Sequence, residues 1–129
     1  MPFDAVAATL GATPYQVALS DGRHGWTGDT PSAGDSGPDP HAQLLAALGT
    51  CTAITVKMYA ERKGWPLTDV QVALRYGDDH RDGDAKIERQ VALTGELDGE
   101  QRERLLQIAN ACPIHKLLSG EIQITTALA

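Results

Sequence analysis

A long apolar stretch near the middle of this 129-residue chain constrains the fold most. Asp39 and Pro40 precede it, in the order typical of an N-cap followed by Pro at the first helical position. Gly64 follows it, as glycine often does just past a helix end. Only Gly49 interrupts the pattern in between. The sequence therefore predicts a single helix over His41–Lys63.

This helix is apolar on nearly every face, and such a helix must be covered on all sides. Its apolar residues are Leu44, Leu45, Ala46, Ala47, Leu48, Ala53, Ile54, Val56 and Met58. A chain of this length has few other elements with which to cover it. Gly49 inside the helix costs about 1 kcal/mol relative to Ala, which the close approach of another backbone would offset. We therefore expect a second copy of the chain to pack there, as a homodimer.

The rest of the chain predicts strands and two shorter helices. The predicted strands are Ala5–Leu10, Pro14–Ser20, Arg23–Gly28, Asp69–Tyr76, Lys86–Leu97 and Ile122–Leu128. A helix is expected from Gly99 to about Cys112 and a short one from Pro113 to Leu118, and Thr30–Pro38 is expected to be a loop. This order predicts a single α+β domain, residues 1–129, with antiparallel sheet.

The charge balance argues against several classes of partner. The chain has 17 acidic and 11 basic residues, a net charge of −6, whereas nucleic acids and anionic membranes attract clustered positive charge. No run reaches the roughly 18 apolar residues of a membrane span. The first ten residues contain Asp4 and no basic cluster, so we expect no secretory signal. With only two cysteines, we expect a cytoplasmic protein with reduced thiols.

The first cysteine, Cys51, lies within the predicted long helix. Thr50, Thr52 and Thr55 place hydroxyl groups on the same part of the helix. Threonines in a helix often bond back to the preceding turn, and a free cysteine often serves as a small core hydrophobe. The residues around Cys51 favour this structural interpretation over a chemical one.

The second cysteine, Cys112, directly precedes Pro113. A residue before proline avoids the helical region, so Cys112 is expected to be the N-cap of the short helix. There a thiolate would be stabilised by free backbone N–H groups and by the positive end of the helix dipole. A plain helix end that contains a cysteine fits the same pattern equally well.

The two cysteines together allow three chemistries. A structural disulfide is disfavoured in an untargeted chain. As metal ligands they would need His115 with His24 or His41; Cys112 and His115 have the spacing of half a zinc site, and a second such pair is missing. As a redox pair, one thiol would be oxidised and the other would resolve it to a disulfide.

Arg23 is the candidate cation for a thiol site. It lies between Gly22 and Gly25 in a predicted turn and is either a solvated hairpin charge or a group that lowers the pKa of a thiol. In the second case its fixed donors would also bind an oxygen-containing substrate. The charged cluster at 78–82 is interpreted as a solvated hairpin tip rather than a metal site.

Three segments carry a resemblance to a known family. They are Gly37–Pro40 with Leu44–Ala53, Lys57–Ala60 and Lys63–Leu67; Ala111–Leu118; and Gly22–His24 with Trp26 and Asp29–Pro31. Over essentially the whole chain the sequence resembles the OsmC/Ohr family of thiol peroxidases, and within it the OsmC-like branch. The resemblance implies an intertwined α+β homodimer with antiparallel sheets and a long central helix that carries the first cysteine.

The resemblance also implies a reaction and its residues. Cys51 would be the peroxidatic thiolate that attacks an organic hydroperoxide, and Cys112 would resolve the resulting sulfenate as a disulfide. An external dithiol of the lipoyl type would reduce that disulfide, with no metal, haem or flavin cofactor. Arg23 would stabilise the Cys51 thiolate and orient the peroxide, in a protein of oxidative-stress defence.

One position departs from the family pattern. Members usually have a Glu on the opening turn of the long helix, paired with the arginine, where this chain has Ala42. The adjacent Gln43 could hydrogen-bond Arg23 without neutralising it. The departure predicts weaker activity, and it motivates a second hypothesis: a weakly active or inactive OsmC-like dimer that binds a small apolar or thiol ligand.

Overall fold

The computed structural model describes residues 5–11, 14–77 and 86–129 of the chain. It contains two compact units, residues 1–44 and 45–129, which are described separately. The expectation of one domain over 1–129 stays a prediction. The charged cluster at 78–82 lies outside the described residues.

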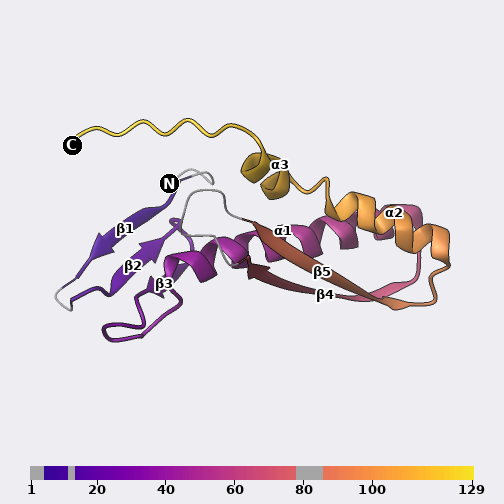
Figure 1. Cartoon of the computed structure of the whole chain (residues 1–129), viewed down its shortest axis with the longest axis horizontal. Coiled ribbons are helices and arrows are strands. Elements are labelled where there is room, and N and C mark those ends of the chain that lie inside the picture. Colours follow the sequence, from indigo (N-terminus) through magenta and orange to yellow (C-terminus); the bar gives the residue numbers. More distant parts are fainter. Residues whose placement is uncertain (1–4, 12–13, 78–85) are drawn as a thin grey trace. The chain divides into compact units, whose positions relative to one another are not determined.

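The first unit contains a three-stranded antiparallel sheet (Figure 1). Its strands are β1 (Ala7–Leu10), β2 (Val17–Ser20) and β3 (Gly25–Gly28), in the spatial order β1-β2-β3. Leu19 pairs with Ala8 on one side and with Trp26 on the other. The three strands predicted in this region are confirmed, each shorter than its apolar pattern suggested.

The turn between β2 and β3 is organised by Asp21. Its carboxylate accepts the backbone N–H groups of Arg23 at 2.8 Å and His24 at 2.6 Å, and it lies 2.9 Å from Nδ1 of the His24 ring. The His24 side chain, followed by these backbone donors, lowers the pKa of Asp21 to about 2. Gly22 has a φ of 90°, which glycine adopts without strain. The turn therefore holds the backbone of Arg23 at its tip.

The loop after β3 is built on Asp29, a buried carboxylate. It accepts the backbone N–H of Thr30 at 2.7 Å and both the backbone N–H and the hydroxyl of Ser36, at 3.0 and 2.6 Å. The Ser36 hydroxyl, then the two backbone donors, lower the pKa of Asp29. The loop predicted at 30–38 is therefore held by hydrogen bonds from Thr30 and Ser36 to the Asp29 carboxylate.

The second unit contains most of the remaining elements. These are α1 (Pro40–Lys63), whose first residues belong to the first unit, β4 (Leu67–Tyr76), β5 (Ile87–Gly95), α2 (Gly99–Ala109) and α3 (Pro113–Ser119). The predicted helix over 41–63 is confirmed, with its start one residue earlier. The predicted helix to about Cys112 ends at Ala109, because Asn110 caps it before the next helix begins at Pro113.

The core of the second unit lies between two helices and a hairpin. β4 and β5 pair antiparallel along their length (Figure 1). Alternate side chains of both strands are half-buried. The buried core residues are Val56, Ala60, Leu67, Leu105 and Ala109, from α1, β4 and α2. The half-buried face of the hairpin therefore supports the two helices that precede and follow it.

Gly49 has a close neighbour in the same chain. A Cβ at this position would lie 2.8 Å from the Cδ1 atom of Leu74, a β4 side chain. Such a distance is too short for two carbon atoms unless the Leu74 side chain shifts. The missing side chain therefore leaves room for Leu74, and the second backbone expected at Gly49 stays a prediction.

The predicted strand over Ile122–Leu128 is wrong for this single chain. Residues 121–129 form no regular structure, and in Figure 1 they trail from α3 as an extended segment. Their alternating apolar residues are exposed: Ile122 to 49%, Ile124 to 85% and Leu128 to 102%. A strand requires a neighbouring strand for its backbone hydrogen bonds, and none of the described strands pairs with this segment.

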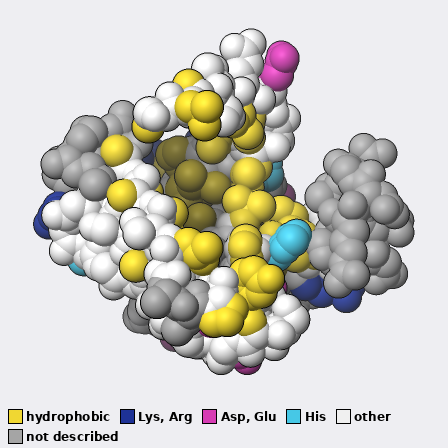
Figure 2. All heavy atoms as spheres, turned by 90° about the vertical axis from the view of Figure 1, so that its left-hand side faces the viewer, with side chains coloured by type: hydrophobic (Ala, Val, Ile, Leu, Met, Phe, Trp, Pro, Cys, Tyr) yellow, Lys and Arg dark blue, Asp and Glu magenta, His cyan; other side chains and the backbone are white. Residues whose placement is uncertain are grey.

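Large hydrophobic side chains are exposed on both units, and Figure 2 shows hydrophobic side chains gathered on one face of the molecule. Those of the first unit are Val6, Leu10, Tyr15, Trp26 and Leu44, and those of the helices in the second are Ile54, Met58, Leu106 and Leu117. Exposed apolar side chains in groups are typical of surfaces that bind a partner. Among the described residues, none of the helices has both the length and the apolar character needed to cross a membrane.

Candidate active site

Folding brings the two cysteines together against the first turn of α3. Cys51 lies in α1, Cys112 is the N-cap of α3, and both are free thiols. The backbone N–H of Ile114 donates to Sγ of Cys51 at 3.5 Å, and the next N–H, that of His115, donates to Sγ of Cys112 at 3.3 Å. The Cys51 thiol also contributes to the lowered pKa of Cys112. Two successive backbone donors thus hold two adjacent sulfur atoms.

Cys112 has no exposed surface and is surrounded by groups that favour its thiolate. Burial raises the pKa of the Cys112 thiol. The His115 backbone, the Thr52 hydroxyl, Cys51 and the charge of Arg89 together lower the pKa by more than burial raises it. The net effect is a pKa below the ordinary thiol value. The N-cap position predicted from Pro113 therefore produces the expected stabilisation, and three side chains add to it.

Cys51 is half-buried and has fewer polar neighbours. Besides the Ile114 N–H, its sulfur lies 3.9 Å from the hydroxyl of Thr55, one turn further along α1. Thr52, the residue after Cys51, is fully buried and donates to the carbonyl of Leu48 at 2.7 Å. The hydroxyl-bearing part of the helix thus bonds back to the preceding turn, as expected, and also contacts both cysteines.

Arg89 of β5 connects the two cysteine-bearing segments, and the sequence reasoning missed it. Its Nη1 donates to the Thr52 hydroxyl at 3.0 Å, and its Nη2 lies 2.9 Å from Oδ1 of Asn110 and 2.8 Å from Nδ1 of His115. The signal was present, since Arg89 occupies an otherwise apolar position in the alternation of its strand, between Ile87 and Val91. An arginine on the inward face of a strand needs buried acceptors.

His115 takes part in the site through both its backbone and its ring. Because a guanidinium only donates, Nδ1 of His115 must accept from Arg89, so the ring is neutral. Burial first, and then the Arg89 charge, lower the pKa of His115 and keep it in this form. The described residues contain no group of three or more His, Cys, Asp and Glu that could hold a metal ion. His24 and His41, the other candidate ligands, belong to the first unit.

Arg23 belongs to the first unit and both cysteines belong to the second. Arg23 is exposed at the β2–β3 turn, and its role toward Cys51 stays a prediction. Gln43, next to Ala42, accepts the indole N–H of Trp26 at 3.2 Å and donates to the carbonyl of Pro38 at 3.1 Å. Its amide thus braces the start of α1 within the first unit.

A pocket of about 390 Å³ adjoins the Arg89 network. Its walls combine the aliphatic side chains of Leu48, Ile87 and Leu118 with Arg89 and His115. An apolar cavity with a few convergent polar groups is typical of small-molecule sites. A ligand with an apolar body and an oxygen-bearing end would fit this lining.

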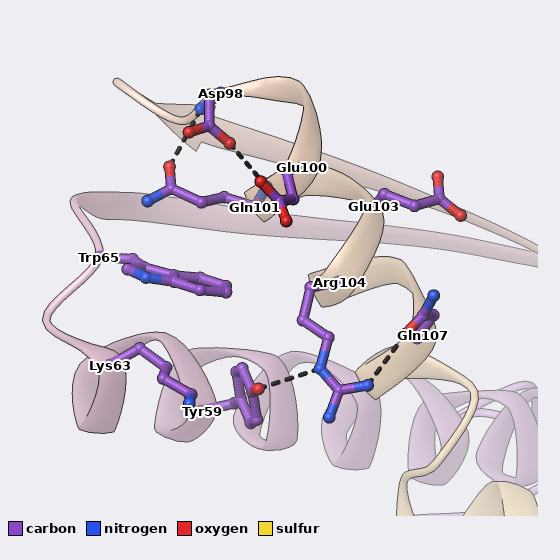
Figure 3. A pocket seen from close by; sticks show the side chains of 9 residues that line it. All are labelled: Tyr59, Lys63, Trp65, Asp98, Glu100, Gln101, Glu103, Arg104 and Gln107. Atoms are coloured by element: carbon purple, nitrogen blue, oxygen red, sulfur yellow. Dashed lines mark hydrogen bonds between the residues drawn. The ribbon is translucent and has the colours of Figure 1, made fainter.

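A larger pocket, of about 670 Å³, lies elsewhere in the second unit, between the end of α1 and α2 (Figure 3). There Arg104 donates to the phenol of Tyr59 at 3.0 Å and lowers its pKa, and Trp65 meets the Tyr59 ring edge-on at a centroid distance of 5.7 Å. No cysteine lines this pocket, and its Asp98 and Gln101 side chains cap α2. Asp98, Gln101 and Arg104 of this pocket therefore have structural partners.

Comparison with known proteins identifies the family. The family model described as OsmC-like protein matches residues 33–127, and the chain therefore belongs to the OsmC family. A search of curated proteins gave no match.

Solved structures share the fold at low sequence identity. An OsmC-like protein from Mycoplasma pneumoniae is 19% identical, with a TM-score of 0.78 over 93% of this chain and 89% of that one. The organic hydroperoxide resistance protein OhrB of Bacillus subtilis is 22% identical, with a TM-score of 0.62 over 90% of each chain. An organic hydroperoxide resistance protein OsmC from Legionella pneumophila is 19% identical, with a TM-score of 0.66 over 90% and 88%. The chain thus has the α+β fold with antiparallel sheets that the resemblance implied.

Proposed function

We propose that this protein is a cysteine-based peroxidase that reduces organic hydroperoxides. The observation that carries the proposal is the pair of sulfur atoms held by successive backbone N–H groups, with a guanidinium bonded to the residues around them. This arrangement contains two thiols that can be oxidised, and the positive charge of the guanidinium favours a thiolate. Family membership and the hydroperoxide-resistance proteins of the same fold support the substrate class.

The first step uses Cys51, the less buried of the two cysteines. Its thiolate attacks the distal oxygen of the hydroperoxide, so a sulfur–oxygen bond forms and the oxygen–oxygen bond breaks. The alkoxide that leaves takes up a proton and departs as the alcohol. Two electrons have passed from sulfur to oxygen, and Cys51 is left as a sulfenic acid.

The second step uses Cys112, whose lowered pKa favours the thiolate form that attacks. Its sulfur attacks the sulfur of the Cys51 sulfenic acid. A disulfide forms, and hydroxide leaves and takes up a proton to become water. An external dithiol of the lipoyl type then reduces the disulfide by exchange and becomes a disulfide itself. The cycle needs no metal, haem or flavin.

Arg23 is proposed to orient the hydroperoxide and to stabilise the Cys51 thiolate. The support is the resemblance of its turn to the family's arginine-bearing turn and the Asp21 hydrogen bonds that fix its backbone. Where the resemblance implies a Glu on the opening turn of α1, this chain has Ala42, whose side chain cannot form an ion pair. We therefore expect activity below that of members that have the Glu.

We propose that the protein works as an intertwined homodimer in the cytoplasm, with α1 as its central helix. Ile54 and Met58 of α1 are exposed to 53% and 56%, and the alternating segment 122–128 lacks a partner strand among the described residues. A second copy of the chain would cover Ile54 and Met58, and one of its strands would pair with the segment 122–128. Light scattering should give twice the chain mass, and a stable monomer would contradict this part of the proposal.

A stopped-flow assay with an alkyl hydroperoxide and a dithiol tests the activity. We expect peroxide to be consumed catalytically and a Cys51–Cys112 disulfide to accumulate when the dithiol is withheld, as detected by mass spectrometry. Unchanged thiols after exposure to excess peroxide would contradict the proposal.

Ala42 supports one alternative, in which the dimer has lost catalysis and binds a small apolar or thiol ligand. Under this alternative both thiols react slowly with an alkylating reagent at neutral pH. Rapid alkylation of Cys51 would favour the peroxidase.

A further inference from the structure

Arg89 connects three parts of the second unit that surround the thiol pair. It projects from β5 and donates to Thr52 on α1, to Asn110 at the end of α2 and to His115 on α3. Thr52 follows Cys51 in sequence, while Asn110 and His115 lie on either side of Cys112. A single guanidinium therefore ties the segment of one cysteine to the segment of the other.

We propose that Arg89 is a positioning residue for the thiol pair: its guanidinium holds the groups around the Cys112 sulfur and stabilises the thiolate there. The inference rests on the proposed function in so far as that thiolate resolves the sulfenic acid. A guanidinium suits the role because its donors are fixed in one plane and its charge is permanent.

The Thr52 hydroxyl provides the connection to sulfur. It has one proton, and two acceptors lie near it: the Leu48 carbonyl at 2.7 Å and the Cys112 sulfur at 3.7 Å. The Arg89 N–H at 3.0 Å occupies one of its lone pairs and limits the directions in which that proton can point. While Cys112 is a thiol, the carbonyl takes the proton; once it is a thiolate, rotation of the hydroxyl lets it donate to sulfur.

His115 provides the second connection. Its ring is fixed by the 2.8 Å contact with Arg89, and its backbone N–H donates to the Cys112 sulfur. Holding the ring therefore also holds the first turn of α3, where both sulfur-bound N–H groups lie. The titratable or charged side chains that act on Cys112 are Cys51 from α1 and Arg89 from β5, and both favour the thiolate.

Arg75 provides a matched control on the same hairpin. It lies on β4, next to Leu74, the residue paired with Arg89, so its side chain projects from the opposite face. There it forms an exposed ion pair with Glu88, and its side chain is 76% exposed. Removing its guanidinium changes the charge of the sheet by the same amount without touching the thiol network.

The test is a titration of Cys112 alone. In a Cys51→Ser background, thiolate formation is followed by ultraviolet absorbance against pH, with Arg89→Gln, Arg89→Lys and Arg75→Gln compared with the parent. We expect Arg89→Gln to raise the midpoint by about one pH unit, a tenfold lower thiolate-to-thiol ratio at a fixed pH. Arg89→Lys should recover part of that shift, because it keeps the charge and loses the planar donors. Arg75→Gln should leave the midpoint unchanged.

The result is distinguishable from the fate of the proposed peroxidase, because the titration needs no peroxide. An Arg89→Gln midpoint equal to that of Arg75→Gln, in protein with unchanged circular dichroism, overturns the inference even if the chain with both cysteines reduces hydroperoxides. The opposite result is a raised Arg89→Gln midpoint together with a chain that has both cysteines and leaves hydroperoxide intact. This result supports the inference and contradicts the proposed peroxidase activity. If Arg89→Gln fails to fold, Arg89→Lys decides alone: its midpoint must lie above that of the parent.

Discussion

Cys51 and Cys112 are held by neighbouring N–H groups of one helical turn, yet their surroundings differ. Cys51 is half-buried on a long helix, with the Thr55 hydroxyl 3.9 Å from its sulfur. Cys112 is fully buried at a helix N-cap, with Thr52 and Arg89 favouring its ionised form. Cys51 is the less buried residue, and Cys112 has more neighbours that favour a thiolate.

The contrast suggests a division of roles between the two thiols. In the proposed reaction Cys51 attacks the hydroperoxide, in keeping with its lower burial, because a hydroperoxide is too large to approach a sulfur with no exposed surface. Cys112, proposed as the resolving thiol, would not need such access, because its target would be the Cys51 sulfur. It would need to be ionised when the sulfenic acid forms, which the groups around Cys112 promote.

Replacing Cys51 should have the largest effect on turnover. We expect Cys51→Ser to lower turnover with an alkyl hydroperoxide and a dithiol by about 1000-fold or more, since a hydroxyl cannot replace the nucleophile. Steady-state peroxide consumption measures this. Near-normal turnover of Cys51→Ser would show that the Cys51 sulfur is not the one that attacks peroxide.

Replacing the buried sulfur should have a smaller and different effect. Cys112→Ser keeps an N-cap acceptor for the His115 N–H, and we expect it still to consume about one equivalent of peroxide and stop as the sulfenic acid. Excess peroxide should then convert Cys51 to the sulfinic acid, visible by mass spectrometry. If this variant consumes no peroxide in the first turnover, the two roles must be exchanged.

Thr52→Val separates the two environments without removing a sulfur. Loss of the hydroxyl should raise the Cys112 thiolate midpoint by about half a pH unit. It should also lower the free energy of unfolding by about 1 kcal/mol, because a donor of Arg89 loses its partner. Thr55→Val, one turn away beside Cys51, is the control and should leave that midpoint in place; equal shifts in both variants would remove the contrast.

The smallest expected effect is a pH dependence of stability. The pKa of Cys112 is lower in the folded chain than its ordinary value of 9.0, so the unfolded chain binds more protons between those two values. Stability should therefore rise as pH increases through that window, and this contribution should be lost as pH falls through the folded value. Urea unfolding at neutral pH and at pH 9 should show a larger rise for the parent chain than for Cys112→Ser; equal changes would contradict the thiolate.

The elements that were predictable from the sequence have local causes. Asp39, Pro40 and Gly64 mark the ends of α1 through the geometry of the adjacent turns, and the N-cap role of Cys112 follows from Pro113 alone. The hairpin of β4 and β5 was visible in its alternating residues for the same reason. The strand predicted at 122–128 failed because alternation shows which face is apolar, and says nothing about whether a neighbouring strand is available.

Two features of the site depend on contacts that the sequence pattern does not specify. Arg89 was visible as a charged residue at an inward position, but its acceptors Thr52 and His115 lie 37 and 26 residues away. The role of Arg23 was inferred from a family resemblance, and its turn alone accounts only for its backbone.

The sequence by itself determined the helices, the hairpin and the capped cysteine, because hydrogen bonds and steric preferences within a few residues decide them. Only the tertiary structure decided that Thr52 and Cys112, 60 residues apart, would lie 3.7 Å from each other, with a guanidinium beside them. That proximity results from packing α1 and the segment after α2 against one hairpin. Packing of this kind depends on the shapes of all the surfaces involved, and no short segment of sequence carries that information.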